Sequence, residues 1–304
     1  PRHGELAVAV HAAGDVEDED VVHPRAPALE LVAGGQGELE EAGIYLRQAM
    51  DMDRHLRAAG LRLFSLESRQ PLDRFDIIGF SLLYELNYTN ILTILELSGI
   101  PFYATRRDES FPLIIAGGPC TCNPEPVADF FDAMVVGDGE SVILQLAASW
   151  LEWKKDAGCK KDALLKRWSK IEGVYIPAYF KPRYDDCGFQ KLEPRYADYA
   201  HVTRTIVADL DRVPFPHKPI IPFGKPVHGR LRLEVARGCT RGCRFCQAGM
   251  ITRPVRERST ATLGEMVENG LRQTGYEEVG MLSLSSADHS EIADLAKGLA
   301  DRYE

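Results

Sequence analysis

Three cysteines within eight residues are the group in this chain best suited to chemistry. Cys239, Cys243 and Cys246 have the spacing C-x3-C-x2-C and follow a predicted strand over 231–235. Closely spaced thiolates on one loop can converge on a soft metal centre, and cysteine thiolates hold [4Fe–4S] clusters. Three protein ligands for four irons leave one iron open. The triplet therefore predicts an iron–sulfur cluster that takes part in chemistry.

Two alternatives remain open for the triplet. A zinc site would need a fourth ligand, which His217 or His228 could supply. Structural zinc sites usually pair two separated ligand couples, and that layout is missing here. The other alternative is three unrelated buried thiols.

Four further cysteines carry weaker signals. Cys120 and Cys122 form a C-x-C pair that could bind a metal, but we interpret them as two loop thiols. Cys159 and Cys187 have no partner in the sequence. The total of seven is odd and no export signal is recognised, so we expect a cytoplasmic protein without a disulfide framework.

The composition is that of a globular protein. The 304 residues are 45% hydrophobic and 27% charged, and this length predicts two domains. No apolar run of about 18 residues occurs, so we expect no membrane span and no membrane partner. The net charge of −9 excludes a globally basic nucleic-acid binder. Ten acids against three bases fall within residues 1–50, which we expect to be weakly structured or anomalous.

Strands and helices alternate after residue 50, which predicts an α/β fold with a parallel sheet. The predicted strands of the first unit each end in small residues, at the edge where open α/β sheets bind ligands. We expect strands over 61–65, 76–81, 112–116 and 133–136, with helices over 52–59, 87–97, 126–131 and 142–153.

The next stretch is less regular, and alternation resumes after it. We interpret residues 154–228 as a connector with a charged helix over 154–171, strand-like residues 173–176 and prolines over 214–226. Beyond it we expect strands over 231–235 and 278–284, with helices over 262–273 and 290–303. Ser259 or Thr260 is the predicted cap of the first of these helices.

The segment Arg237–Cys246 resembles the cluster loop of radical S-adenosylmethionine (SAM) enzymes. The resemblance implies a loop after the first strand of a partial (β/α)6 barrel, with SAM chelating the open iron through its amino and carboxylate groups. It implies reductive cleavage of SAM to a 5′-deoxyadenosyl radical, and an electron donor such as flavodoxin or ferredoxin. It also implies that Phe245 packs near the adenine.

In that superfamily the second strand often ends in a Gly-Gly-Glu motif that holds the amino group of SAM. This chain has Ser283–Asp288 at that place. We predict that Asp288 contacts the ammonium group and that Ser285 and Ser286 belong to the same cofactor site. The alternative is that these residues cap the helix beginning near Ser290.

A longer similarity, over residues 55–304, is to radical SAM proteins with a B12-binding domain, and above all to an uncharacterised bacterial family whose members continue beyond this chain. The segments that carry it are Phe64–Ser68, Asp76–Tyr88, Ala116–Pro126 and Val135–Glu140. In related domains the corrinoid lies on the carboxyl edge of a Rossmann-like sheet. The resemblance thus implies cofactor contacts at Ser81 with Leu82, Gly117, Gly118, Pro119, Gly137, Gly139 and Glu140.

One feature of cobalamin domains is absent. No histidine of this chain lies in an Asp-x-His-x-x-Gly motif, whose histidine ligates cobalt. Two readings therefore stay open, a cobalamin-binding domain and a structural Rossmann-like module, because glycine-rich loops alone are weak evidence.

Five arginines lie in and after the cysteine loop: Arg241, Arg244, Arg253, Arg256 and Arg258. They could bind an anionic substrate, including RNA phosphates. We favour the interpretation that they neutralise the cluster, the SAM carboxylate and nearby acids.

The predicted architecture is a Rossmann-like, cobalamin-binding-type domain over 51–153, the connector, and the truncated start of a radical SAM barrel over 229–304. An eight-unit barrel takes about 250 residues, so this last segment holds about two units, and we expect the fragment alone to be inactive. The predicted function is radical SAM catalysis, with methyl or methylthio transfer if cobalamin binds, and the substrate is unknown. The alternative is a non-catalytic iron–sulfur or zinc scaffold.

Overall fold

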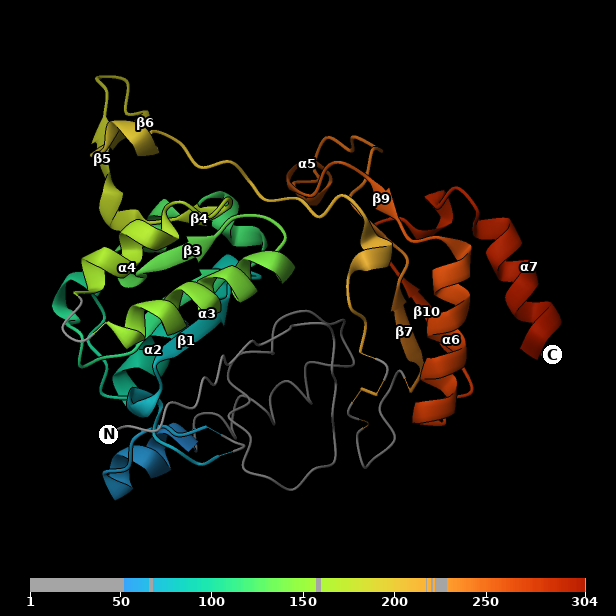
Figure 1. Ribbon diagram of the computed structural model, residues 1–304, viewed down its shortest axis with the longest axis horizontal. Helices are drawn as coiled ribbons and strands as arrows, with labels where there is room; N and C mark the ends of the chain where they lie inside the picture. The colour runs from blue at the N-terminus through green and yellow to red at the C-terminus, as the bar shows by residue number, and fades with distance from the viewer. Residues whose placement is uncertain are drawn as a thin grey trace. The chain divides into compact units, whose positions relative to one another are not determined.

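A computed structural model describes residues 52–65, 68–156, 160–216, 218–219, 221 and 229–303. The predictions for residues 1–50, Cys159, His217 and His228 lie outside this part of the chain. The described residues form two compact units, the first ending at Thr205 and the second beginning at Ile206 (Figure 1). Each unit is described by itself.

A four-stranded sheet forms the centre of unit 1. Strands β1 (Ile77–Ser81), β2 (Leu113–Gly117) and β3 (Ala133–Val135) run parallel, and β4 (Val174–Tyr175) pairs antiparallel with β3. Their apolar runs are nearly continuous because both faces of the sheet are covered. The predicted α/β fold with a parallel sheet is confirmed for this unit.

Helices connect these strands. Residues 52–59 are helical, α2 (Tyr88–Leu97) links β1 to β2, and α3 (Glu140–Lys155) follows β3. The predicted helix over 126–131 is a 3-10 helix, η5 (Glu125–Phe130), and the predicted strand over 61–65 is reduced to a single bridge between Phe64 and Pro71. Short 3-10 turns occupy further loops: η1 (Leu72–Arg74), η2 (Glu85–Asn87), η3 (Ala104–Arg106), η4 (Pro119–Cys122), η6 (Pro177–Tyr179) and η7 (Ala197–Tyr199).

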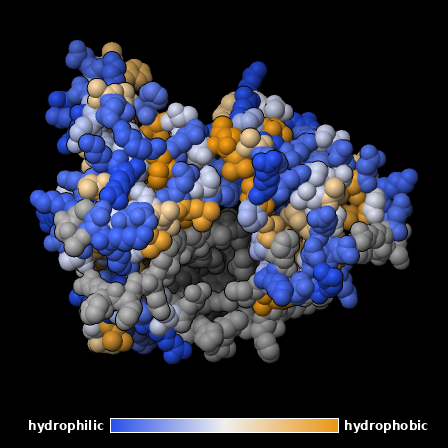
Figure 2. All heavy atoms as spheres, viewed as in Figure 1, coloured by the Kyte–Doolittle hydropathy of each residue, from blue (hydrophilic) through white to orange (hydrophobic). Residues whose placement is uncertain are grey.

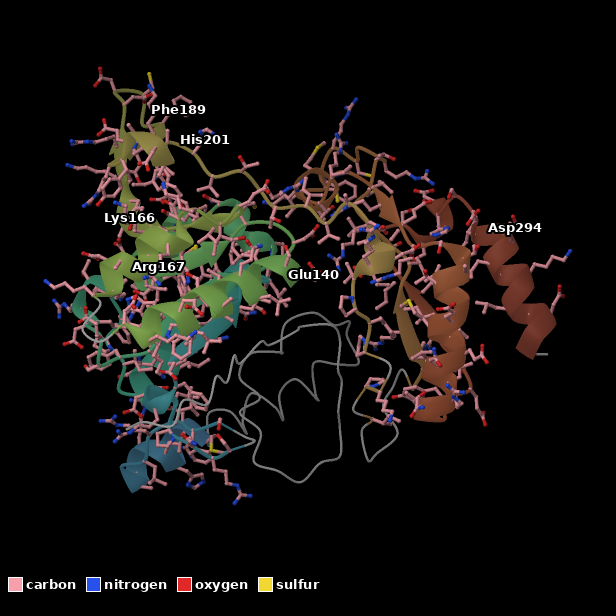
Figure 3. The ribbon with its side chains drawn as sticks, in the orientation of Figure 1. Glu140, Lys166, Arg167, Phe189, His201 and Asp294 are labelled. Atoms are coloured by element: carbon pink, nitrogen blue, oxygen red, sulfur yellow. The ribbon has the colours of Figure 1, made fainter. Side chains whose placement is uncertain are left out.

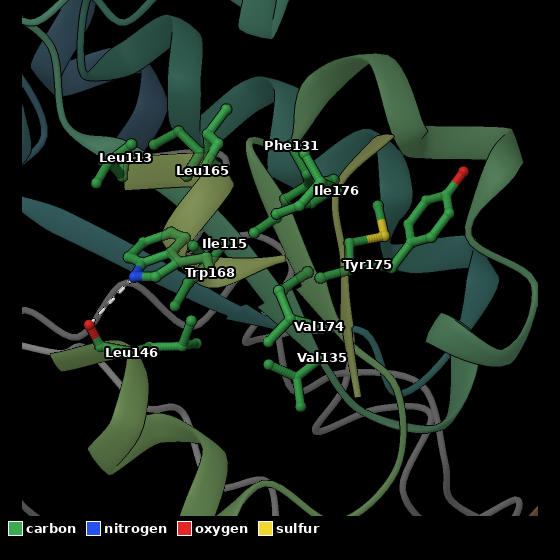
Figure 4. Close-up of a cluster of buried hydrophobic side chains, with 14 of the residues drawn as sticks. Leu113, Ile115, Phe131, Val135, Leu146, Leu165, Trp168, Val174, Tyr175 and Ile176 are labelled. Atoms are coloured by element: carbon green, nitrogen blue, oxygen red, sulfur yellow. Dashed lines mark hydrogen bonds between the residues drawn. The ribbon is translucent and has the colours of Figure 1, made fainter. Parts of the chain in front are cut away.

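Much of the predicted connector belongs to the core of unit 1, which corrects the sequence interpretation. Helix α4 (Lys161–Trp168) buries Leu164, Leu165 and Trp168, and β4 extends the sheet. Trp168 is 0% exposed, and its indole Nε1 donates to the Leu146 carbonyl at 3.3 Å (Figure 4). The charges of α4 lie on its outer face, so the charged sequence concealed a short apolar stripe.

A two-stranded hairpin completes unit 1. Strands β5 (Phe180–Tyr184) and β6 (Gln190–Pro194) pair antiparallel, and most of their residues are exposed. Phe189 lies near the turn at the end of this hairpin, while Glu140 lies at the start of α3 (Figure 3).

Unit 2 contains a βαβ arrangement. Strand β7 (Leu231–Glu234) pairs parallel with β10 (Val279–Leu282), and α6 (Thr260–Thr274) connects them by way of a core with Leu231, Leu263 and Val267. The predicted cap is confirmed at Ser259, whose Oγ accepts from the Thr262 backbone N–H at 3.2 Å. The remaining elements are η8 (Leu210–Arg212), β8 (Ala236–Arg237), α5 (Ala248–Ile251), β9 (Arg256–Glu257), η9 (Ser286–Asp288) and α7 (Ile292–Tyr303).

Hydrophilic side chains cover much of the described surface in the view of Figure 2, with smaller apolar groups between them. None of the described helices has the length and apolar character needed to cross a membrane.

Candidate cluster and cofactor site

The two ends of the cysteine loop in unit 2 lie side by side, because the short strands before and after the loop pair with each other. Strands β8 and β9 pair antiparallel, with Ala236 opposite Glu257 and Arg237 opposite Arg256. All three cysteines lie in the segment between these strands. The pairing therefore closes the base of the loop and fixes where its two ends lie.

Gly238 makes this closure sterically feasible. Its φ is +86°, and a Cβ atom there would lie 2.5 Å from the Pro254 carbonyl oxygen and 2.9 Å from that of Thr252. A larger residue would strain the backbone and clash with the returning chain. The residue before the first cysteine must therefore be glycine in this conformation.

Two of the cysteine sulfurs accept backbone hydrogen bonds. The N–H of Arg241 donates to Cys239 Sγ, and that of Gly249 donates to Cys246 Sγ, both at 3.4 Å. Backbone N–H groups of this kind can also donate to the sulfur of a metal-bound cysteine. Cys243 is exposed, and its carbonyl accepts from the Cys246 N–H at 3.0 Å.

The donor set, three cysteine thiols on one loop, fits a thiolate-bound iron–sulfur cluster. The described ranges contain no group of three Cys, His, Asp or Glu side chains placed to hold a single metal ion. The identity of the bound metal centre therefore stays a prediction from the cysteine spacing.

Asp288 lies against the cysteine loop through an ion pair with Arg241. Arg241 Nε donates to Asp288 Oδ2 at 2.6 Å, and Nη2 donates to Oδ1. The Arg241 guanidinium, with a hydrogen bond from Ser285, lowers the pKa of Asp288 to about 2. Asp288 is therefore tied to the cysteine loop by an arginine that the sequence analysis did not pair with it, and its contact with SAM stays a prediction.

The two predicted serines lie in the turn after β10. Ser286 Oγ is 3.0 Å from Ser283 Oγ, and Ser285 makes no side-chain cap bond to η9. The side chain of Phe245 is 91% exposed, so its ring makes few packing contacts with the described residues. The structure thus brings Asp288 to the loop, while the roles of Phe245, Ser285 and Ser286 stay predictions.

The five arginines divide by their partners. Arg256 and Arg258 are 9% and 2% exposed and bond mainly to backbone carbonyls, so they do not offer a surface for an anion. Arg253 Nε donates to the Gly249 carbonyl at 2.9 Å, and Arg241 pairs with Asp288. Arg244 is exposed. Arg256 and Arg258 are thus held mainly by backbone carbonyls, which leave no mark in a sequence, while Arg258 also lies 3.5 Å from the Glu234 carboxylate, one of the nearby acids that the arginines were expected to neutralise.

At the carboxyl edge of the unit 1 sheet, the first two loops pack on each other. The Leu82 N–H donates to the Gly117 carbonyl at 2.7 Å, and the Cys120 N–H donates to the Leu82 carbonyl at 2.9 Å. Gly118 has a φ of +101°, and a Cβ there would lie 2.9 Å from the Leu82 oxygen. The chain itself therefore takes up the space that this glycine frees.

The third loop meets a later segment. A Cβ on Gly137 would lie 2.1 Å from the Thr205 carbonyl oxygen, and the Thr205 N–H donates to the Val136 carbonyl at 3.0 Å. By contrast, nothing lies within 4 Å of the corresponding positions of Gly117 and Gly139. At Gly118 and Gly137 the protein backbone itself thus lies in the space that a side chain would need, and the cofactor contacts at these glycines stay predictions.

Other predicted contacts at this edge stay open. Ser81 and Glu140 are half-buried, and Pro119 is exposed. Glu140 begins the 16-residue helix α3. The part of the predicted corrinoid surface that other chain segments do not cover consists of these three residues and the open sides of Gly117 and Gly139.

Sequence reasoning missed a polar group on this edge. Tyr88 and Glu85 surround Cys120, and burial together with the nearby Cys120 raises the pKa of Tyr88 to about 12. Burial, with the Glu85 carboxylate, also raises the pKa of Cys120, which keeps this thiol protonated at neutral pH. The sequence signal that could have indicated this group is that Glu85 and Tyr88 follow β1 and Cys120 follows β2, so both segments begin at the same edge of the sheet.

Residues 43–177 match the family model for the N-terminal region of radical SAM proteins. The matched residues are 135 of the chain's 304, so this similarity to radical SAM proteins covers somewhat less than half of the chain. The match ends just beyond β4, which agrees with the place of α4 and β4 in the core of unit 1.

The chain is also similar to an uncharacterized protein of Methanocaldococcus jannaschii. The two are 27% identical over 269 residues, which cover 86% of this chain and 50% of the relative. The chain thus spans about half the length of the curated relative it matches.

Two solved structures of a radical SAM methyltransferase, TsrM from Kitasatospora setae, are also similar. One, with tryptophan substrate and a SAM analog bound, has a TM-score of 0.46 at 15% identity, and the match covers 91% of this chain and 48% of that chain. The other, with cobalamin and a [4Fe–4S] cluster bound, has a TM-score of 0.45 at 14% identity and covers 95% and 50%. Both TM-scores are low.

Proposed function

We propose that this protein is a radical SAM enzyme that holds a [4Fe–4S] cluster on Cys239, Cys243 and Cys246 and uses it to cleave SAM. The observation that carries the proposal is the C-x3-C-x2-C loop between β8 and β9, with backbone N–H groups donating to two of its sulfurs. When bound, the cluster and SAM supply reductive cleavage to a 5′-deoxyadenosyl radical.

The chain's own residues bind and orient the cofactor in this proposal. Asp288 takes the ammonium group of SAM, which competes with Arg241 for the carboxylate. Arg241, once released, becomes the partner for an anionic group beside the cluster. Phe245 covers the adenine, and Ser285 and Ser286 donate to the cofactor. No general acid or base is assigned.

Unit 1 is proposed as a Rossmann-like domain of the cobalamin-binding type, and unit 2 as the first part of a partial (β/α)6 barrel. The proposed corrinoid-binding face of unit 1 is formed by Ser81, Pro119 and Glu140 together with the open sides of Gly117 and Gly139. Gly118 and Gly137 shape that face from within. Cobalamin at this place would direct the chemistry to methyl or methylthio transfer onto a substrate still to be identified, with flavodoxin or ferredoxin as electron donor. RNA is the less favoured substrate, because two arginines of the basic segment are buried.

Iron and acid-labile sulfide per chain after anaerobic reconstitution test the cluster. We expect four of each in the wild type and none in a Cys239/Cys243/Cys246→Ala variant. The matched control is a Cys122/Cys187→Ala variant, because both thiols are exposed and lie outside the loop. Loss of iron in the control as well as in the triple variant would overturn the assignment, and stoichiometric zinc without iron would favour a scaffold.

A further inference from the structure

Two buried guanidinium groups lie under the cysteine loop. Arg256 and Arg258 flank Glu257 at the end of β9. Burial of a cation is costly unless its N–H groups are satisfied. The partners of these two side chains therefore show what the buried charges hold together.

Arg256 joins the returning arm of the cysteine loop to a distant segment of unit 2. Its Nε donates to the Pro254 carbonyl at 3.1 Å, and its Nη2 donates to the Thr252 carbonyl at 3.2 Å. Its Nη1 donates to the carbonyl of Val207 at 3.0 Å. The Thr252 and Pro254 carbonyls are also the groups that Gly238 approaches, so this guanidinium lies where both ends of the loop meet.

Arg258 makes the second connection. Its Nη1 donates to the Leu210 carbonyl and, at 3.4 Å, to that of Val213, while its Nε donates to the Glu234 carbonyl at 3.1 Å. Its Nη2 lies 3.5 Å from the Glu234 carboxylate, which also binds Arg237 through two hydrogen bonds. Glu234 thus connects the end of β7, the residue before Gly238, and Arg258.

These bonds make residues 207–213 a strap across the base of the cysteine loop. The strap is held through three of its carbonyls, at Val207, Leu210 and Val213, and a fourth bond runs from Ser259 N–H to Asp211 Oδ1 at 3.0 Å. A planar guanidinium can reach three carbonyls in fixed directions, which an ammonium on a flexible stem cannot reproduce.

We propose that Arg256 and Arg258 are positioning residues that fasten this strap to the cysteine loop and so hold the three thiolates in the arrangement that binds the cluster. The inference rests on the proposed function for its consequence, because the strap matters to chemistry only if the loop holds the cluster. The fastening itself is a property of the chain without a cofactor.

Hydrogen exchange of the full chain without metal tests the fastening. In Arg256→Met we expect amides of residues 238–252 to exchange about tenfold faster or more, because hydrogen bonds to a buried charge are lost. Amides in the middle of α6 should exchange at the wild-type rate. Arg212→Met is the matched control, because Arg212 lies in the strap but its side chain is 86% exposed.

Arg256→Lys keeps the charge and serves if Arg256→Met does not fold. We expect it to fold with a loosened loop, since one ammonium nitrogen cannot reach three carbonyls that are bound by three separate nitrogens of the guanidinium. Wild-type exchange of residues 238–252 in the folded Lys variant would overturn the proposal.

The cofactor-dependent consequence is measured by the rate at which reconstituted cluster is lost to an iron chelator. We expect this rate to rise about tenfold in Arg256→Lys and to stay unchanged in Arg212→Met. If the wild-type protein binds no cluster, the proposed function is refuted. If Arg256→Lys still loosens the loop in that case, the fastening of the strap by Arg256 is supported independently. A cluster lost at the wild-type rate despite a loosened loop would overturn the positioning role.

Discussion

The Thr205 carbonyl oxygen lies where the side chain of Gly137 would begin. A Cβ there would be 2.1 Å from that oxygen, and the Asp138 N–H donates to the same carbonyl at 3.1 Å. The glycine after β3 thus serves the packing of one chain segment against another. A glycine-rich loop at a sheet edge is in this case a structural joint, and not by itself a sign of a ligand.

Gly137→Ala should therefore destabilise unit 1. The φ of +105° and the contact with Thr205 together should lower the free energy of unfolding by about 1–3 kcal/mol, as for other strained backbone positions. Urea unfolding followed by circular dichroism measures it. Gly139→Ala is the control, because nothing lies within 4 Å of its Cβ position, and it should cost well under half as much. Equal losses in the two variants would contradict the steric account.

A second prediction concerns the buried ion pair between Arg107 and Asp132. The two side chains lie 3.2 Å apart and are almost fully buried, and Asp132 Oδ2 also accepts from the Ile114 N–H at 2.7 Å. Asp132→Ala leaves the Arg107 charge buried without this carboxylate, so we expect a loss of about 3–5 kcal/mol in the free energy of unfolding.

Chemical denaturation monitored at the tryptophans provides the measurement for Asp132→Ala. The control is Asp198→Ala, because the Lys170–Asp198 pair is exposed to solvent and should contribute little. A similar midpoint for both variants would show that burial does not set the importance of the Asp132 pair.

Two glycines of α6 should respond to alanine with opposite signs. At Gly264 nothing lies within 4 Å of the Cβ position, so alanine should stabilise the protein by about 0.5–1 kcal/mol through helix propensity. At Gly270 a Cβ would lie 2.5 Å from Leu231 Cδ2 in the core, so overpacking should cost about 1–3 kcal/mol. Thermal melts of the two variants compare them directly, and stabilisation by both would show that Leu231 can move aside.

The Arg241–Asp288 pair predicts a pH dependence. The folded-state pKa of Asp288, about 2, lies below the ordinary value of 3.8. The stabilisation from the pair is therefore fully present above about pH 4 and is lost as the pH falls toward 2. Carbon-13 NMR of the Asp288 carboxyl should show its pKa returning toward 3.8 in Arg241→Met. An unchanged pKa in this variant would assign the shift to another group.

How much could be predicted differed between the elements. The strands β1, β2 and β3 and the helices α2 and α3 could be predicted from apolar runs and helical spacing. These patterns lie within each segment, so they can be recognised without knowing which other segments pack against it. Helix α4 and strand β4 also lie within the predicted helix over 154–171 and the strand-like residues 173–176, but their place in the core was not predicted, since Trp168 and Val174 are buried by residues distant in the sequence. The first half of the predicted connector therefore belongs to the core of unit 1.

The site shows the same division. The spacing of Cys239, Cys243 and Cys246 and the glycine before them are local properties, so the sequence alone determined the candidate cluster loop and the chemistry that its thiolates can support. Only the tertiary structure decided the partners of the charged groups: Asp288 binds Arg241, and Arg256 and Arg258 bind carbonyls of residues 207–213. Backbone carbonyls are present at every residue, so a sequence cannot tell which of them an arginine will meet, whereas the folded chain brings a few of them within hydrogen-bond distance.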